Sequence, residues 1–187
     1  ILVFGEAAGG ALAPASLEAA AGGAQLAQAF GEPLLGALIG TDLSAASQQF
    51  QSGFSSLYVV EGAQYRPYSA SAYLAAASTV IAACSPSAIL LPHTAQTKDW
   101  APQLAAHLGA GLIMDCVALT AEGRDVVVTK PVCGGAVSGQ FVIRGTPGIA
   151  TVRNGACSNQ VKARWIIPIA NAPITPVSSP SKKMRLI

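Results

Sequence analysis

Short apolar runs alternate with alanine-rich stretches of helical length along the first part of this chain, up to Gly109. The runs are nearly continuous in apolar character, which is typical of strands that are buried on both faces of a parallel sheet. The stretches between them are long enough for helices that cross from one parallel strand to the next. The expected strands are Ile1–Glu6, Leu34–Gly40, Leu57–Glu61 and Ala88–Pro92, and the expected helices are Ala13–Phe30, Ser44–Phe50, Ser69–Cys84 and Asp99–Leu108.

The pattern changes after Gly109, where strand-like runs follow one another with no helical stretch between them. The links between these runs carry glycine and proline, which favour hairpins. The first run, Leu112–Leu119, completes the alternating order as its fifth strand. The runs expected to be antiparallel are Asp125–Val132, Gln140–Arg144 and Ile149–Arg153. We therefore predict an α/β fold: a doubly wound, mostly parallel, Rossmann-like sheet with right-handed crossovers and an antiparallel hairpin extension.

Composition narrows the class of protein further. Hydrophobic residues make up 51% of the 187 residues and charged residues only 11%, compared with about 25% charged residues in an average domain. This excludes an intrinsically disordered chain, and the small charged surface favours a partner that covers part of it. No apolar run is long enough for a transmembrane helix. We expect one domain at residues 1–157 and a basic tail containing proline and serine at residues 158–187.

The charge is divided unevenly along the chain. Residues 1–97 hold five acids and one base, whereas residues 98–187 hold four acids and ten bases, and no acid follows Asp125. A basic half of this kind can face an acidic protein, an anionic lipid or RNA, or it can be a solvated surface. The sequence leaves these alternatives open.

The cysteines argue against a metal site and against a disulfide framework. Cys84, Cys116, Cys133 and Cys157 form no C-x-x-C pair, and four cysteines are few for a chain of this length. We therefore expect no zinc, and we expect reduced, partly buried thiols in a reducing compartment.

Residues able to do chemistry are present but isolated. The loop Gly5–Gly10 after the first strand is rich in glycine, but it lacks the G-x-G-x-x-G pattern and the P-loop lysine of a phosphate site. His93 follows the fourth strand at the edge where such sheets bind ligands, and with no acid nearby in the sequence it is interpreted as a structural, hydrogen-bonded histidine. Asp99 is expected to be the N-cap of its helix rather than a base. Other candidates without a catalytic context are His107, Ser16, Ser138, Cys84 and Cys157. We assign no catalytic, cofactor-binding or metal-binding residue.

The segment from Thr94 to Cys116 resembles a signature of the electron-transfer flavoprotein alpha subunit, G-R-D-x-A-P-R-x-A-A-x-L followed by an aspartate. Two further segments are similar to motifs of the same family: Lys130–Gly135 to R-P-x-Y-x-G, and Thr151–Ala156 to T-V-R-P-x-A. Leu12–Pro14 with Glu18 is compatible with its first helix. The matching residues of the first segment are Asp99, Ala101, Pro102, Ala105, Ala106, Leu108 and Asp115. The resemblance covers residues 1–157.

The resemblance carries implications for partners and cofactor. Alpha subunits of this family have two domains: an N-terminal α/β domain that packs against the beta subunit, and a C-terminal domain that holds most of the FAD. The chain stops about thirty residues after Arg153, where the second domain is expected to begin. We therefore expect no cofactor in this chain, FAD on the missing domain or on a partner, and no catalytic activity of the chain on its own.

Several polar positions depart from the family pattern. Thr97 and Lys98 stand in place of Gly-Arg, Gln103 in place of Arg, and Cys133 in place of Tyr, and neither Lys nor Gln reproduces the bidentate fork of Arg. Two roles remain open: a domain that packs against partner subunits in an electron-transfer system, or a structural accessory subunit of a large mitochondrial respiratory or ribosomal assembly. A stand-alone nucleotide-binding domain is a weaker third role because phosphate chemistry is absent. The expected location is the matrix side of the mitochondrion for a eukaryotic protein and the cytoplasm for a bacterial one.

Overall fold

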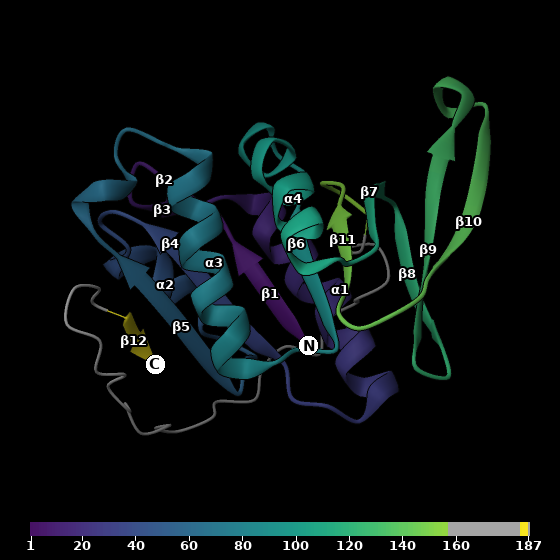
Figure 1. Cartoon of the computed structure of the whole chain (residues 1–187), viewed down its shortest axis with the longest axis horizontal. Coiled ribbons are helices and arrows are strands. Elements are labelled where there is room, and N and C mark those ends of the chain that lie inside the picture. Colours follow the sequence, from purple (N-terminus) through teal and green to yellow (C-terminus); the bar gives the residue numbers. More distant parts are fainter. Residues whose placement is uncertain (157–183, 187) are drawn as a thin grey trace.

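A seven-stranded sheet forms the centre of the computed structural model, which describes residues 1–156 and 184–186 (Figure 1). The strand order is β12-β5-β4-β1-β6-β11-β7. β12 pairs antiparallel with β5, and all other neighbours pair in parallel. The strands are β1 (Leu2–Gly5), β4 (Leu35–Gly40), β5 (Ser56–Glu61), β6 (Ala88–Pro92), β7 (Leu112–Cys116), β11 (Gly148–Val152) and β12 (Met184–Leu186). The predicted doubly wound, mostly parallel α/β sheet is confirmed.

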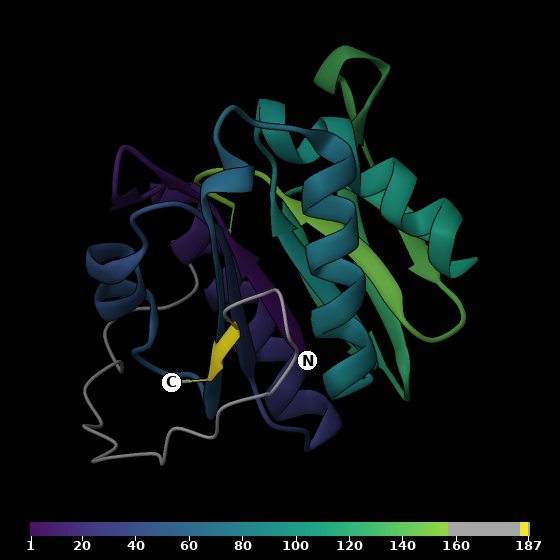
Figure 2. The same cartoon turned by 60° about the vertical axis from the view of Figure 1, so that its left-hand side comes forward.

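Helices cover both faces of this sheet (Figure 2). Successive residues of β1 point into different cores: Val3 packs in the core shared with α1 and α2, whereas Leu2 and Phe4 pack in the core shared with α3 and α4. All three side chains are 2% exposed or less, which explains why the strand is apolar at every position. The helices are α1 (Pro14–Phe30), α2 (Ser44–Phe50), α3 (Ala70–Cys84) and α4 (Ala95–Leu108), with a short 3-10 turn η1 (Ala63–Tyr65).

The start of α4 corrects one prediction. The helix begins at Ala95, four residues before the expected Asp99. Thr94 is the N-cap, and its Oγ1 accepts a hydrogen bond from the Thr97 N–H at 3.1 Å. Asp99 therefore lies inside the helix and caps nothing. Threonine and aspartate are both good N-caps, and the chain uses the one that follows β6 directly.

The strands after Gly109 differ from the prediction in their pairing. β11 was expected in the antiparallel extension, but it joins the parallel sheet, inserted between β6 and β7. β7 lies in the parallel sheet, as the alternation of strands and helices predicted. The expected single run Leu112–Leu119 is also two strands, because β7 ends at Cys116 and β8 begins at Ala118 in another sheet. Asp115, whose φ of 70° is left-handed, lies in β7 where its register with β11 shifts. Sequence patterns locate strands well but do not give their spatial order.

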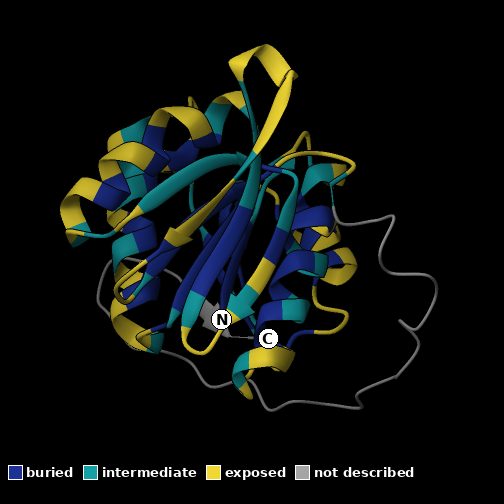
Figure 3. Cartoon of the chain, turned by 90° about the vertical axis from the view of Figure 1, so that its right-hand side faces the viewer, coloured by how far each residue is buried: buried dark blue, intermediate teal, exposed yellow. Residues whose placement is uncertain are grey.

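A separate three-stranded antiparallel sheet connects β7 to β11, and it contains two of the three predicted hairpins. Its order is β10-β9-β8, formed by β8 (Ala118–Glu122), β9 (Asp125–Val132) and β10 (Val137–Ile143), with a 3-10 turn η2 (Cys133–Gly135) at one tip. The third expected hairpin link, at residues 145–148, instead joins β10 to β11, which lie in different sheets. β8 packs against α1, so the small sheet stands where a crossover helix would otherwise lie. The β9–β10 hairpin extends beyond the body of the molecule, and most of its far end is exposed (Figure 3).

The glycine-rich loop after β1 folds into a small hairpin of its own. β2 (Ala7–Ala8) pairs antiparallel with β3 (Ala11–Leu12) around Gly9 and Gly10, both of which have positive φ. Left-handed backbone of this kind suits glycine, so the turn explains the two glycines without a ligand.

The predicted tail lies almost wholly outside the described residues. Of the range 158–187, only β12 is placed, against the edge of β5. The interpretation of Cys157 as a reduced thiol and the expected division at residue 157 therefore stay predictions.

Candidate functional site

The strand order reverses between β1 and β6, and at this point open α/β sheets bind their ligands. Here the crevice is filled by the protein's own groups. Glu6 directly follows β1, and its Oε2 accepts a hydrogen bond from the hydroxyl of Thr94, the N-cap of α4. Ser16 holds the backbone of Glu6 from the other side, since its Oγ accepts from the Glu6 N–H at 2.9 Å and donates to the Glu6 carbonyl at 3.3 Å.

The negative charge of the Glu6 carboxylate limits the kinds of ligand that this crevice can bind. A helix N-terminus carries partial positive charge and is a ready site for a phosphate. At α4 the hydroxyl of the N-cap Thr94 is hydrogen-bonded to the Glu6 carboxylate, whose charge repels an anion at this helix end. This carboxylate belongs to the Gly5–Gly10 loop and disfavours a phosphate there, and the interpretation of the loop from the sequence stays a prediction.

A second hollow lies beside the crevice, at the carboxyl ends of β4 and β5. Its lining includes Asp42, Glu61 and Arg66. Glu61 Oε1 accepts a hydrogen bond from the Leu43 N–H at 2.9 Å, and Asp42 and Arg66 form an ion pair at 4.0 Å between two exposed side chains. Exposed pairs of this length contribute little to stability. The two carboxylates also make the hollow unsuitable for an anion.

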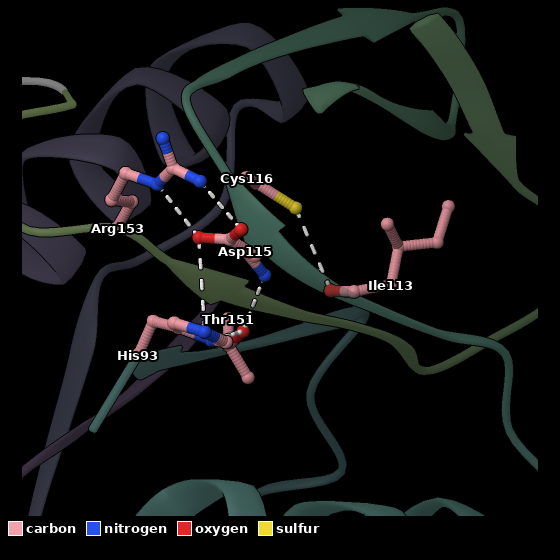
Figure 4. A network of polar contacts seen from close by, with 6 residues as sticks. All are labelled: His93, Ile113, Asp115, Cys116, Thr151 and Arg153. Carbon is pink, nitrogen blue, oxygen red and sulfur yellow. Dashed lines mark hydrogen bonds and ion pairs between the residues drawn. The ribbon is translucent and has the colours of Figure 1, made fainter. Parts of the chain in front are cut away.

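Four polar side chains meet at the carboxyl ends of β6, β11 and β7 (Figure 4). The Thr151 hydroxyl oxygen accepts a hydrogen bond from the Asp115 N–H at 2.9 Å and lies 2.8 Å from Nδ1 of His93. Arg153 donates through Nε and Nη2 to the two carboxylate oxygens of Asp115, at 2.7 and 2.6 Å. We call His93, Asp115, Thr151 and Arg153 the strand-end network.

The neutral tautomer of His93 with its proton on Nε2 gives the strand-end network a consistent arrangement of protons. The Thr151 hydroxyl donates to Nδ1 of His93, and the proton on Nε2 faces Oδ1 of Asp115, 3.7 Å away. Burial lowers the pKa of His93, Asp115 opposes this, and the cations Lys98, Arg153 and Lys130 lower it further. The hydrogen bonds from Arg153 lower the pKa of Asp115. A neutral histidine and an ionised aspartate are therefore the stable forms.

The network also contains residues that the sequence pattern did not identify. His93 was interpreted as hydrogen-bonded with no acid nearby; the hydrogen bond to Thr151 confirms the first part, but Asp115 supplies an acid in space. Asp115 and Arg153 both lie in segments that resemble family motifs, and that shared placement was the one signal that they act together. Their pairing needs β11 to lie beside β7, which no local pattern gives.

Lowering the pH from about 7.5 to about 5 should reduce the free energy of unfolding through His93. In the unfolded chain a histidine takes up its proton near pH 6.5, whereas the folded imidazole has a lowered pKa, so the unfolded state binds more protons in this window. The stabilisation by Asp115, whose pKa is also lowered, is lost only at more acidic pH, near and below about 4. Urea unfolding at several pH values measures both effects.

The two histidines of the chain provide the test and its control. His93→Gln should flatten the stability profile between about pH 7.5 and about pH 5, whereas His107→Gln should leave it as in the wild type, because His107 is exposed in the last turn of α4. A His93→Gln profile as steep as that of the wild type would contradict the assignment.

The remaining candidates are structural or lie at the surface. Asp99 accepts a hydrogen bond from the Tyr68 hydroxyl at 2.9 Å, and burial together with this bond raises the pKa of Tyr68. Burial raises the pKa of the half-buried Cys84 thiol and makes it less reactive. Ser138 is exposed on β10. Among residues 1–156 and 184–186, no three His, Cys, Asp or Glu side chains gather in a way that could hold a metal ion.

An apolar groove of about 390 Å³ lies between α4, β7 and the β9–β10 hairpin. We call it the hairpin groove. Its one charged residue is Lys130. Val137 on β10 extends this apolar surface, with 56% of the residue exposed, whereas Val142, 44% exposed, lies on the opposite face of the strand. The apolar lining consists of Pro102, Leu112, Ile113, Met114, Val132 and Phe141. A cluster of exposed apolar side chains around a groove is typical of a protein-binding surface.

Comparison with known proteins gives a consistent result. A family model described as "Electron transfer flavoprotein domain" matches residues 1–179. The electron transfer flavoprotein subunit alpha of Bacillus subtilis is 30% identical over 154 residues, which are 82% of this chain and 47% of that protein. The subunit of the same name from Syntrophomonas wolfei is 29% identical over 132 residues, 70% of this chain and 42% of that protein. The LctC subunit of the lactate dehydrogenase (NAD(+),ferredoxin) of Acetobacterium woodii is 29% identical over 147 residues, 77% of this chain and 35% of that protein.

The chain thus spans about half the length, or less, of these bacterial relatives. In the described part of the chain, no helix combines the length and the apolar character needed to cross a membrane. The mitochondrial location and the basic half as a surface for lipid or RNA stay predictions.

Proposed function

This chain belongs to the electron transfer flavoprotein domain family, and from that membership we propose that it is the N-terminal α/β domain of an alpha-type subunit. In this role the domain packs against a second, beta-type subunit of an electron-transfer system. Its contribution is contact with the partner rather than chemistry. The proposal goes beyond the family assignment, because the chain spans only part of each relative.

The hairpin groove is the observation that carries this proposal. Phe141 lines the groove and is 40% exposed, and Val137 is exposed on the same face of β10. Val142 is exposed on the opposite face of that strand. Only 11% of the residues are charged, so the chain has little charged surface to offset an exposed apolar patch. Such a patch marks a surface that a partner covers. Burial of these side chains against a partner is worth about 25 cal/mol for each Å² of apolar surface removed from water.

We propose that the flavin of such a system binds outside the described residues. The pyrophosphate of a dinucleotide binds at the turn after the first strand of such a sheet. Here that turn carries the Glu6 carboxylate, whose negative charge opposes a second anion. The strand-end network has a structural explanation, since it ties the ends of β6, β7 and β11 together. The resemblance to alpha subunits likewise implies that FAD sits mainly in another domain.

The test is native mass spectrometry of the protein purified from its source, with a flavin absorbance spectrum of the same fraction. We expect a heterodimer with a beta-type flavoprotein subunit and a flavin spectrum that follows the heterodimer. A monomer without a partner, or a large particle without a beta-type subunit, would overturn the proposal. The second of these outcomes would instead favour an accessory role in a larger assembly.

A further inference from the structure

β10 forms one edge of the small sheet and lacks the residues that normally protect an edge strand. It pairs only with β9, over all seven of its residues, so every second backbone N–H and C=O points away from the sheet. Natural edges are normally protected by lysine, proline or an inward-pointing charge. Val137–Ile143 contains none of these. Within the described residues, no element covers this edge.

The side chains of β10 continue the apolar surface on both sides of this edge. Val137 and Phe141 lie on one face, and the groove-lining Val132 is the cross-strand partner of Val137. Val142 lies on the opposite face. A strand added beside β10 would therefore place alternate side chains next to Phe141 in the hairpin groove and the others next to Val142.

The charged residues near β10 indicate which kind of strand can pair with this edge. Lys130 on β9 is the cross-strand partner of Gly139, and Arg144 directly follows β10, which carries no charged residue of its own. A second copy of this chain would bring the same cations to the same edge, and like charges would oppose the pairing. A strand with apolar alternate residues and flanking Asp or Glu side chains has the complementary chemistry.

We propose that β10 is extended by a strand from the partner subunit, with apolar alternate side chains and acidic flanking residues. The backbone hydrogen bonds of β10 hold that strand, and the hairpin groove selects its side chains. This inference rests on the proposed function, because the strand belongs to the second subunit.

The experiment is amide hydrogen exchange of this chain, alone and in its complex with the beta-type subunit. Strand addition should protect the amides of Val137–Ile143 with a period of two, because only alternate N–H groups face the new strand. Docking of side chains alone would protect them without that period. A complex that forms without the alternating protection overturns the strand inference, whereas failure to form any complex overturns the proposed function.

Affinity measurements on two variants and a control complete the test. Val142→Lys places a charge on the free edge and should raise the Kd by about tenfold or more. Lys130→Glu reverses the charge in the hairpin groove and should also weaken binding, with a smaller dependence on salt. Leu17→Lys is the control, because Leu17 is an exposed apolar residue on α1, 55% exposed and away from β10. Wild-type affinity in both test variants, or an equal loss in Leu17→Lys, would contradict the proposal.

Discussion

Phe4→Ala should lower the free energy of unfolding by about 3–5 kcal/mol, the usual cost of removing a buried aromatic ring. Phe4 is 2% exposed, and its ring meets that of Trp100 edge to face, with 5.6 Å between centroids and 84° between planes. The contact joins β1 to α4, so the loss affects the face of the sheet that α3 and α4 cover. Urea unfolding followed by far-ultraviolet circular dichroism measures the change.

A matched control for Phe4→Ala is Leu17→Ala, since Leu17 is 55% exposed on α1. This variant should stay within about 0.5 kcal/mol of the wild type. A Phe4→Ala protein with a similarly small loss would show that α4 does not depend on the contact between Phe4 and Trp100.

Gly23→Ala should destabilise the protein by about 1–2 kcal/mol, although alanine favours a helix over glycine by about 1 kcal/mol. Gly23 lies in α1 where the helix crosses β1, and a Cβ at this position would clash with Cγ2 of Val3 and lie 3.0 Å from Cδ1 of Leu34. Overpacking of this kind costs more than the gain in helix propensity. Comparison of urea midpoints at constant slope gives the sign directly.

A double-mutant cycle separates the two effects at Gly23. Val3→Ala removes the methyl group that the new Cβ would strike, at the cost of a small cavity. If the clash is the cause, Gly23→Ala should be far less costly in the Val3→Ala background, giving a coupling energy of about 1 kcal/mol. Additive effects would attribute the loss to some other cause.

The sequence was most informative where a pattern is local. The strand β6 and the helix α2 have the predicted bounds, because a buried run and a short helix are set by neighbouring residues. The start of α4 was wrong because Thr94 and Asp99 offer caps of similar quality, and only the position of β6 decides between them.

Spatial order and the strand-end network could not be predicted in the same way. His93 and Asp115 are 22 positions apart, and Arg153 follows 38 positions after Asp115. They meet only because β11 enters the sheet between β6 and β7. The hairpins were predicted from glycine and proline, but the sequence did not reveal that they replace a crossover helix.

The insertion of β11 has a consequence for how the molecule is made. During synthesis the chain emerges from its N-terminus, so β6 and β7 are complete while the strand that joins them is still unsynthesised. Until Val152 has left the ribosome, β6 has an open edge on that side and Asp115 has no arginine to bind. Nascent chains that pause before this point expose the apolar edge of β6 that β11 later covers. A chaperone would therefore be most useful while the ribosome synthesises the segment from β8 to β10.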